Sequence, residues 1–198
     1  MSPPRRTPES IEELRSELID HALRIIGRDG PEALTMRALA AEADCAVGLP
    51  YKVFADRHDL VIALVMAELT SLRHEAAALL ARAGSGTVAG NLTWFAERLL
   101  DSPAVALAPE IIADGALSRT MAADAHRAGA GPHMFDAWFA DYLAAEQRTG
   151  RVQPEVDVGA FGFLIAGAIH NLIVSGEPYP RPGRDRLASV LAAVTARL

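Results

Sequence analysis

One stretch decides the fold of this 198-residue chain: the residues from Thr35 to Leu60, which read TMRALAAEADCAVGLPYKVFADRHDL. Thr35 is a natural N-cap and predicts a short helix from there to about Ala43. A tight connection leads to a second short segment over about Val47 to Phe54, after which Asp56 can cap a long helix. Two short helical segments joined by a tight turn are typical of a helix-turn-helix, whose later helix enters the major groove of DNA.

Pro50 limits how the second short segment can fold. Proline lacks a backbone N–H, so it is acceptable only within the first turn of a helix. We therefore expect either that this helix begins near Val47 or that its first turn is distorted. Val47 and Leu49 cannot hydrogen-bond to bases, although both can contact thymine methyl groups.

Nearly every other stretch of the sequence has its apolar residues at helical spacing, without a convincing strand or hairpin pattern. In the first helix, Ser10 and Glu13 fit a capping box, and Gly30 with Pro31 ends it. Later helices are expected at about residues 56–84, 87–100, 104–114, 118–146 with an interruption at 129–132, 156–175, and 184–198 after a Gly/Pro-rich loop at 176–183. We predict an all-α protein, with an N-terminal three-helix bundle containing the helix-turn-helix over residues 1–57 and a larger helical domain over residues 58–198.

Composition excludes several other classes of protein. The chain is 51% apolar and 22% charged, as in ordinary folded domains. Its one cysteine, Cys45, cannot form an internal disulfide and suits a reducing compartment. The N-terminal residues have no signal-peptide core, and the longest apolar run, Val158 to Ile169, is too short to span a bilayer. We expect a cytoplasmic protein without membrane attachment, whose net charge of −6 gives no general attraction to DNA.

The central stretch resembles the N-terminal signature of the TetR (tetracycline-repressor-like) family of transcriptional regulators. The resemblance covers about residues 10–65, and the positions that carry it are Gly30, Leu34, Thr35, Leu39, Ala40, Ala43, Gly48, Tyr51, Phe54, Arg57, Asp59 and Leu60. It implies a repressor that binds a palindromic double-stranded DNA operator as a homodimer and is released by a small, largely apolar effector. Ala46, Leu49 and Pro50 depart from the family pattern.

The residues that we expect to contact DNA lie in or beside the helix-turn-helix, and their side chains are hydroxyl-bearing, cationic, apolar or, for glycine, absent. They are Thr35, Arg37, Val47, Gly48, Leu49, Tyr51, Lys52 and Arg57. Thr35 can be a phosphate anchor as well as a plain N-cap, and Phe54 is expected in the core. Arg5 and Arg6 form either a minor-groove arm or a solvated tail. Residues 1–60 carry 8 basic and 11 acidic side chains, so DNA contact must come from a local basic patch and backbone amides, with modest affinity or a strong dependence on dimer geometry.

The last two helices are the expected dimer surface, because a single recognition helix reads too few bases. Gly159, Gly162 and Gly167 in the apolar run permit close helix approach, and the final helix presents a Leu/Val stripe. The alternative is that this run is the buried core of a monomer.

An effector pocket is expected among the aromatic and polar side chains of the middle helices. The candidates are Trp94, Phe95, Arg98, His126, Met134, Trp138, Tyr142, His170 and Asn171. Ordinary core packing is the better interpretation for any single one of them, whereas the group and the family resemblance together favour a pocket.

The sequence contains no nucleophile elbow, phosphate-binding loop or dinucleotide fingerprint. We therefore expect neither an enzyme nor a cofactor. A metal site at His126, His133 and Asp136 is conceivable but not favoured, and Cys45 is expected to pack rather than to sense redox state. The alternatives to a regulator are a helical protein that has lost DNA binding and acts as a ligand-binding module, and an adaptor that binds only protein.

Overall fold

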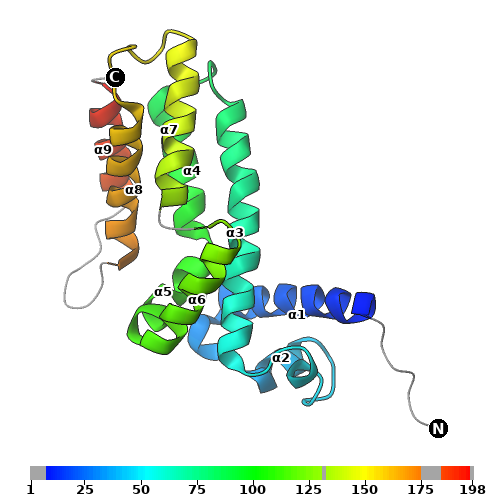
Figure 1. Ribbon diagram of the computed structural model, residues 1–198. Helices are drawn as coiled ribbons and strands as arrows, with labels where there is room; N and C mark the ends of the chain where they lie inside the picture. Colours follow the sequence, from blue (N-terminus) through cyan, green and yellow to red (C-terminus); the bar gives the residue numbers. More distant parts are fainter. Residues whose placement is uncertain (1–7, 131–132, 175–183, 197–198) are drawn as a thin grey trace.

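The computed structural model describes residues 8–130, 133–174 and 184–196, and within these ranges the chain is helical without strands (Figure 1). The α-helices are α1 (Pro8–Asp29), α2 (Met36–Glu42), α3 (Arg57–Ala81), α4 (Val88–Asp101), α5 (Pro103–Ala113), α6 (Gly115–Arg127), α7 (His133–Arg148), α8 (Val158–Val174) and α9 (Arg184–Thr195). Two short 3₁₀ helices, η1 (Pro31–Ala33) and η2 (Pro50–Lys52), flank α2. The predicted all-α fold is confirmed. No helix in the described ranges is long and apolar enough to cross a membrane.

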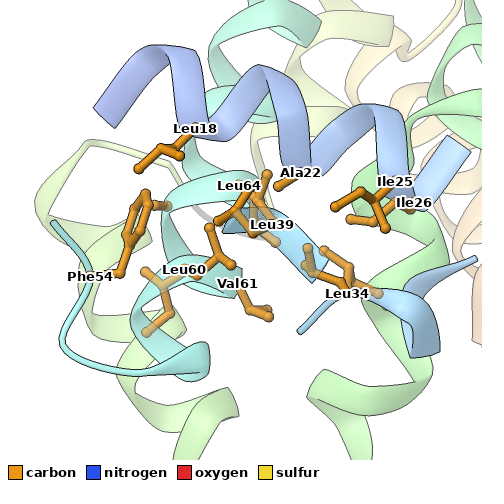
Figure 2. Close-up of a cluster of buried hydrophobic side chains, with 14 of the residues drawn as sticks. Leu18, Ala22, Ile25, Ile26, Leu34, Leu39, Phe54, Leu60, Val61 and Leu64 are labelled. Atoms are coloured by element: carbon orange, nitrogen blue, oxygen red, sulfur yellow. The ribbon is translucent and has the colours of Figure 1, made fainter. Parts of the chain in front are cut away.

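A first hydrophobic core joins the N-terminal helices to the beginning of α3. Leu18, Ala22 and Ile25 of α1 face Leu39 of α2 and Leu60 of α3 (Figure 2). Leu107, Ile111 and Leu117 from α5 and α6 also belong to this core. The N-terminal helices are therefore packed against the rest of the chain at α5 and α6 as well as through α3.

A second core lies farther along α3, in the upper bundle of Figure 1. Leu72, Ala76 and Leu79 of α3 pack there with side chains from α4, α7, α8 and α9. The long helix α3 thus supplies one segment, residues 60–65, to the first core and another, residues 72–79, to the second.

Local capping explains where two of these helices begin. The Thr35 hydroxyl accepts the Ala38 N–H at 3.0 Å, and the Asp56 carboxylate accepts the Asp59 N–H at 2.9 Å. Both predicted N-caps are therefore confirmed. The predicted capping box at Ser10 is wrong, because α1 already begins at Pro8 and places Ser10 inside the helix.

Gly162 allows α7 and α8 to approach each other closely. A Cβ added at Gly162 would lie 2.5 Å from the Asp136 carbonyl oxygen, closer than real Cβ atoms approach such a group, and 3.0 Å from the Ala140 amide nitrogen. This glycine therefore serves packing within the chain rather than a surface for a partner. Gly159 and Gly167 are exposed.

Candidate nucleic-acid interface and effector region

A tight turn follows α2 and reverses the chain. The Cys45 N–H donates to the Ala40 carbonyl at 2.9 Å, and Asp44 has a φ of 46°. Aspartate tolerates this left-handed conformation better than most residues do. Of the residues that follow the turn, 46–48 and 51–52 are exposed, whereas Pro50 and Phe54 are buried.

The segment after the turn is not the α-helix predicted from about Val47 to Phe54. Leu49 donates to the Ala46 carbonyl at 2.8 Å and Lys52 donates to the Leu49 carbonyl at 3.0 Å, which is the three-residue spacing of a 3₁₀ helix. Pro50 has no N–H to donate to Ala46 across an α-helical turn. The distortion expected for the first turn therefore extends to Lys52 and Val53, which also donate at three-residue spacing, and no α-helix follows it within this segment.

The turn presents a small surface of four residues, Val47, Gly48, Tyr51 and Lys52, which we call the reading surface. The side chains of Val47 and Tyr51 are 53% and 56% exposed, and Gly48 and Lys52 are also exposed. Val47 and Tyr51 are four residues apart, as are Gly48 and Lys52. Pro50 is buried beneath them.

Leu49 differs from its neighbours in direction. It is half-buried and lines a shallow cleft against α1, together with Leu14, Leu18 and Cys45. Its side chain therefore packs toward the protein and is not part of the reading surface. Phe54 is fully buried, with the Arg15 guanidinium 4.8 Å from its ring centre, as a core residue is expected to be.

Thr35 and Arg37 lie exposed at the start of α2. The Thr35 hydroxyl caps the helix, which still leaves it at the surface beside the first amides of α2. The Ala38 N–H is bonded to that hydroxyl, so the N–H groups that a phosphate can reach at this helix N-terminus are those of Met36 and Arg37.

Arg57, which was also expected to contact DNA, is engaged within the protein instead. Its Nε donates to the Leu34 carbonyl at 2.7 Å, its Nη2 donates to the Pro31 carbonyl at 3.3 Å, and both terminal nitrogens donate to the Glu110 carboxylate. The guanidinium that we expected at a DNA phosphate is therefore already occupied by protein acceptors. Arg57 joins α3 to the turn before α2 and to α5.

Most cations of the N-terminal helices are paired with carboxylates. Arg15 lies 3.9 Å from Asp59, and both Arg24 and Arg28 contact Glu42, at 3.6 Å and 3.0 Å. The hydrogen bond from Arg28 holds the pKa of Glu42 below its usual range. Of the six cations described between residues 8 and 60, Arg37 and Lys52 are the two outside any ion pair. The predicted arm at Arg5 and Arg6 lies outside the described residues.

Trp94, a predicted effector contact, is held between two arginines. The guanidinium carbons of Arg82 and Arg98 each lie 4.5 Å from the centre of its ring system, and Arg98 also pairs with Glu75 at 3.0 Å. This stack ties α3 to α4. Arg82 and Glu75 were missed because nothing in their sequence spacing links them to Trp94.

Other predicted effector contacts pack against one another. Phe95 is fully buried, with its ring centre 6.0 Å from that of Trp138 and 5.4 Å from that of Phe139. Trp138 also meets Phe135 edge to face at 5.2 Å. These side chains were expected to line an effector pocket, but in the structure they fill that space by packing against one another.

Tyr142 belongs to a buried polar network. Its hydroxyl donates to the Glu146 carboxylate at 2.5 Å and accepts from the Asn91 amide at 3.0 Å. Glu146 also accepts the Gly84 N–H at 3.0 Å and lies 3.6 Å from the Arg151 guanidinium. Burial, reinforced by Glu146, raises the pKa of Tyr142. The i, i+4 spacing of Tyr142 and Glu146 was a local signal for this pair, whereas Asn91 gave none.

The remaining predicted effector contacts are scattered. His126 is exposed near the end of α6, Met134 is half-buried in the first turn of α7, and His170 and Asn171 are exposed on α8. Asn171 alone among the predicted contacts lines a cavity of about 210 Å³ between α8 and α9, with Ala168, Leu172, Arg186, Leu187 and Val190. The predicted residues do not form one pocket in this conformation.

The described part of the chain holds no group of three or more His, Cys, Asp or Glu side chains that could bind a metal ion. His133 does lie 3.4 Å from Asp136. His126 does not join them in such a group.

The chain therefore consists of an N-terminal part, in which a tight turn joins α2 to η2, and a helical bundle, and the two parts share the long helix α3. Residues 18–64 match the family model described as bacterial regulatory proteins of the tetR family. This part of the chain is similar to the N-terminal domain of that family, and the resemblance noted in the sequence is confirmed.

A curated relative is similar to this chain over about a third of its length. The HTH-type transcriptional regulator BetI of Rhizobium meliloti is 35% identical over 71 residues, which are 36% of this chain and 35% of that protein. The chain thus matches about a third of the length of this curated relative.

Solved structures extend the likeness in fold to nearly the whole chain. A protein from Mesorhizobium loti assigned to the TetR family of transcriptional regulators superposes with a TM-score of 0.68 at 17% identity, covering 96% of each chain. The multidrug binding protein EbrR, complexed with imidazole, gives a TM-score of 0.53 at 20% identity and covers 91% of this chain and 93% of its own. The relatives are named as transcriptional regulators, which is the class of protein that the sequence predicted.

Proposed function

We propose that this protein is a transcriptional repressor that binds a palindromic DNA operator as a homodimer and leaves it when a small, largely apolar effector binds. The observation that carries the proposal is the exposed reading surface, set in a domain that matches the tetR family. A Val, a Tyr and a Lys side chain held outward on a tight turn are suited to a DNA groove and have no evident use in packing.

The DNA contacts that we propose divide into two kinds. Thr35, Arg37 and the first amides of α2 bind phosphate, which positions the protein without reading sequence. Val47, Gly48 and Tyr51 approach the base edges, and Lys52 reaches a phosphate or a guanine edge. Leu49 and Arg57 are left out of this interface, because their side chains are engaged within the protein.

The homodimer that we propose forms through α8 and α9. Phe163 and Leu164 on α8 are 64% and 59% exposed, an apolar surface that a partner subunit would cover. Two helices from each subunit would make a four-helix interface. Such a dimer binds two half-sites on one face of the DNA, about 34 Å apart.

Effector binding is proposed to act through α3, which contributes to both hydrophobic cores. The residues nearest to a common site are Trp94, Phe95, Trp138 and Tyr142 in or beside the second core. An effector there would displace packed side chains. It shifts the equilibrium between the DNA-binding and the released conformation only to the extent that its affinities for the two conformations differ. The imidazole held by EbrR supports the view that this fold accepts small molecules. A regulator of this kind works in the cytoplasm.

The test of the proposed function is selection of bound sequences from a random pool of duplex DNA by the full chain. We expect enrichment of an inverted repeat whose half-sites are about one helical turn apart. Enrichment of no sequence would overturn the proposal.

A second candidate function is a ligand-binding or protein-interaction module that no longer binds DNA. The acidic character of the N-terminal helices favours it, since Arg37 and Lys52 are the described cations there without an ion pair. In that case the selection fails, and anisotropy with random DNA shows no binding even at low salt, where a DNA-binding protein binds most tightly.

A further inference from the structure

We propose that the protein reads its operator through the C5-methyl group of thymine, and that Val47 is the side chain that makes this contact. The inference rests on the proposed DNA-binding function and names the chemical feature of the operator that the reading surface takes. It follows from the side-chain chemistry of the turn, its burial and its charge.

The tip of the turn has no side chain that can hydrogen-bond to a base. The five residues from Ala46 to Pro50 are Ala, Val, Gly, Leu and Pro, which have neither donors nor acceptors in their side chains. Hydrogen-bonded readout is therefore left to Tyr51 and Lys52. What the tip itself can recognise in the major groove is the one apolar group there, the thymine methyl.

Of the two branched apolar side chains at the tip, Val47 alone is free to make this contact. Leu49 packs into the cleft against α1, while Val47 projects outward with 53% of its surface exposed. Covering that surface with a methyl group removes apolar area from water on both sides of the contact, which favours binding. Gly48, beside Val47, adds no side chain that would hold the backbone away from the groove.

The charge around the turn makes this small apolar contact important. Among the cations described between residues 8 and 60, Arg37 and Lys52 are the two not held by a carboxylate, so phosphate attraction is weak for a DNA-binding surface. Arg37 lies in the first turn of α2 and Lys52 at the end of η2, and two exposed cations without a carboxylate partner suit a groove bordered by phosphates. An apolar protein partner would gain little from these unpaired cations, so the surface favours DNA over protein.

The experiment uses the operator obtained by selection and replaces each thymine of a half-site, one at a time, by deoxyuridine, which removes only the methyl group. Binding to the full chain is measured by fluorescence anisotropy. We expect that, at one or more positions, replacing thymine by deoxyuridine weakens binding of the wild-type protein about fourfold. This is the effect of losing one buried methyl group from the contact. With Val47→Ala, binding to the thymine operator falls, and deoxyuridine at that position has no further effect.

Leu80→Ala is the matched control, since Leu80 is an exposed aliphatic residue at the far end of α3. It should keep the full deoxyuridine effect. If deoxyuridine is tolerated at every position of a specifically bound operator, methyl reading is overturned while the proposed function stands. If the effect persists in Val47→Ala, the assignment to Val47 is overturned. If the pool yields no operator and random DNA is not bound, the proposed function fails as well.

Discussion

Arg57, the first residue of α3, holds both carboxylate oxygens of Glu110 on α5, with Nη2 2.9 Å from Oε2. The same guanidinium donates to the carbonyls of Pro31 and Leu34. Beside it, His58 Nε2 lies 3.3 Å from the carboxylate of Asp114, which caps α6. Two neighbouring side chains at the start of α3 therefore connect the N-terminal helices to α5 and α6. An effector that moves α5 or α6 would act on the reading surface through this junction.

Glu110→Gln should lower the free energy of unfolding by about 1 kcal/mol, because it removes the charge from a two-pronged ion pair that solvent still reaches. Both side chains are 31% exposed. Urea unfolding measures the change. Glu75→Gln, which weakens the more exposed pair with Arg98, is the control and should have a smaller effect. Equal effects of the two variants would contradict a special role for the junction.

Tyr142→Phe should destabilise the protein by about 1–2 kcal/mol at neutral pH, since Asn91 and Glu146 each lose a buried hydrogen-bond partner. It should also change the response to alkali. The pKa of Tyr142 is raised in the folded protein by burial and by Glu146, whereas in the unfolded chain the phenol ionises near pH ~10. The unfolded state therefore loses its proton first, so this contribution to stability is complete below about pH 10 and is lost as the pH rises above it.

Urea unfolding at several pH values between neutral and strongly alkaline measures this effect. Tyr142→Phe should decline less above about pH 10 than the wild type. Tyr51→Phe, at an exposed position, should decline like the wild type. The same alkaline loss in Tyr142→Phe would show that other groups cause it.

Gly162→Ala should destabilise the fold by about 1–3 kcal/mol, because the new methyl group would press on the backbone of α7. Gly167→Ala on the same helix meets no atom within 4 Å and should be neutral or stabilising in the fold, by up to about 1 kcal/mol. Thermal unfolding compares the two. Similar losses in both would mean that Gly162 does not lie against the backbone of α7.

Phe163→Glu should convert a dimer into monomers and weaken operator binding, because it puts a charge into the proposed apolar interface. Sedimentation equilibrium and anisotropy give the two readouts. Ile112→Glu, at an exposed position on α5, is the control and should leave the dimer intact. A Phe163→Glu protein that remains dimeric would exclude this face of α8 as the interface.

Operator binding should depend on salt less steeply than is usual for a dimeric repressor. If Arg37 and Lys52 of each subunit neutralise one phosphate apiece, the logarithm of the affinity falls with the logarithm of salt concentration with a slope of about −4. Anisotropy between about 50 and 200 mM salt measures the slope. Lys52→Gln should make it shallower by about 2 in the dimer, and an unchanged slope would exclude phosphate contact by Lys52.

Features that depend on neighbouring residues were predictable from the sequence. Thr35 and Asp56 were identified as helix caps because an N-cap bonds within its own first turn. The distortion caused by Pro50 was foreseen for one turn, since its missing N–H acts locally, but not its extension over the whole segment. The outward position of Tyr51 and Lys52 also followed from the signature and is what the structure has.

Features set by distant contacts were not predictable in this way. The direction of Leu49 depends on α1, and the occupation of Arg57 depends on Glu110, 53 residues away. The aromatic residues of α4 and α7 were recognised as a group, but periodicity cannot distinguish a pocket from a filled core. Phe95 and Trp138 meet because two helices cross, and no sequence spacing encodes that contact.

The continuity of α3 has a geometric consequence. One residue inserted between residues 65 and 72 would turn the reading surface by about 100° around the helix axis relative to the bundle and move it about 1.5 Å along that axis. In a symmetric pair of subunits, the two copies of the turn would then point along different directions. The length of α3 thus sets the operator geometry that the assembly can accept, even though the inserted residue itself would not touch DNA.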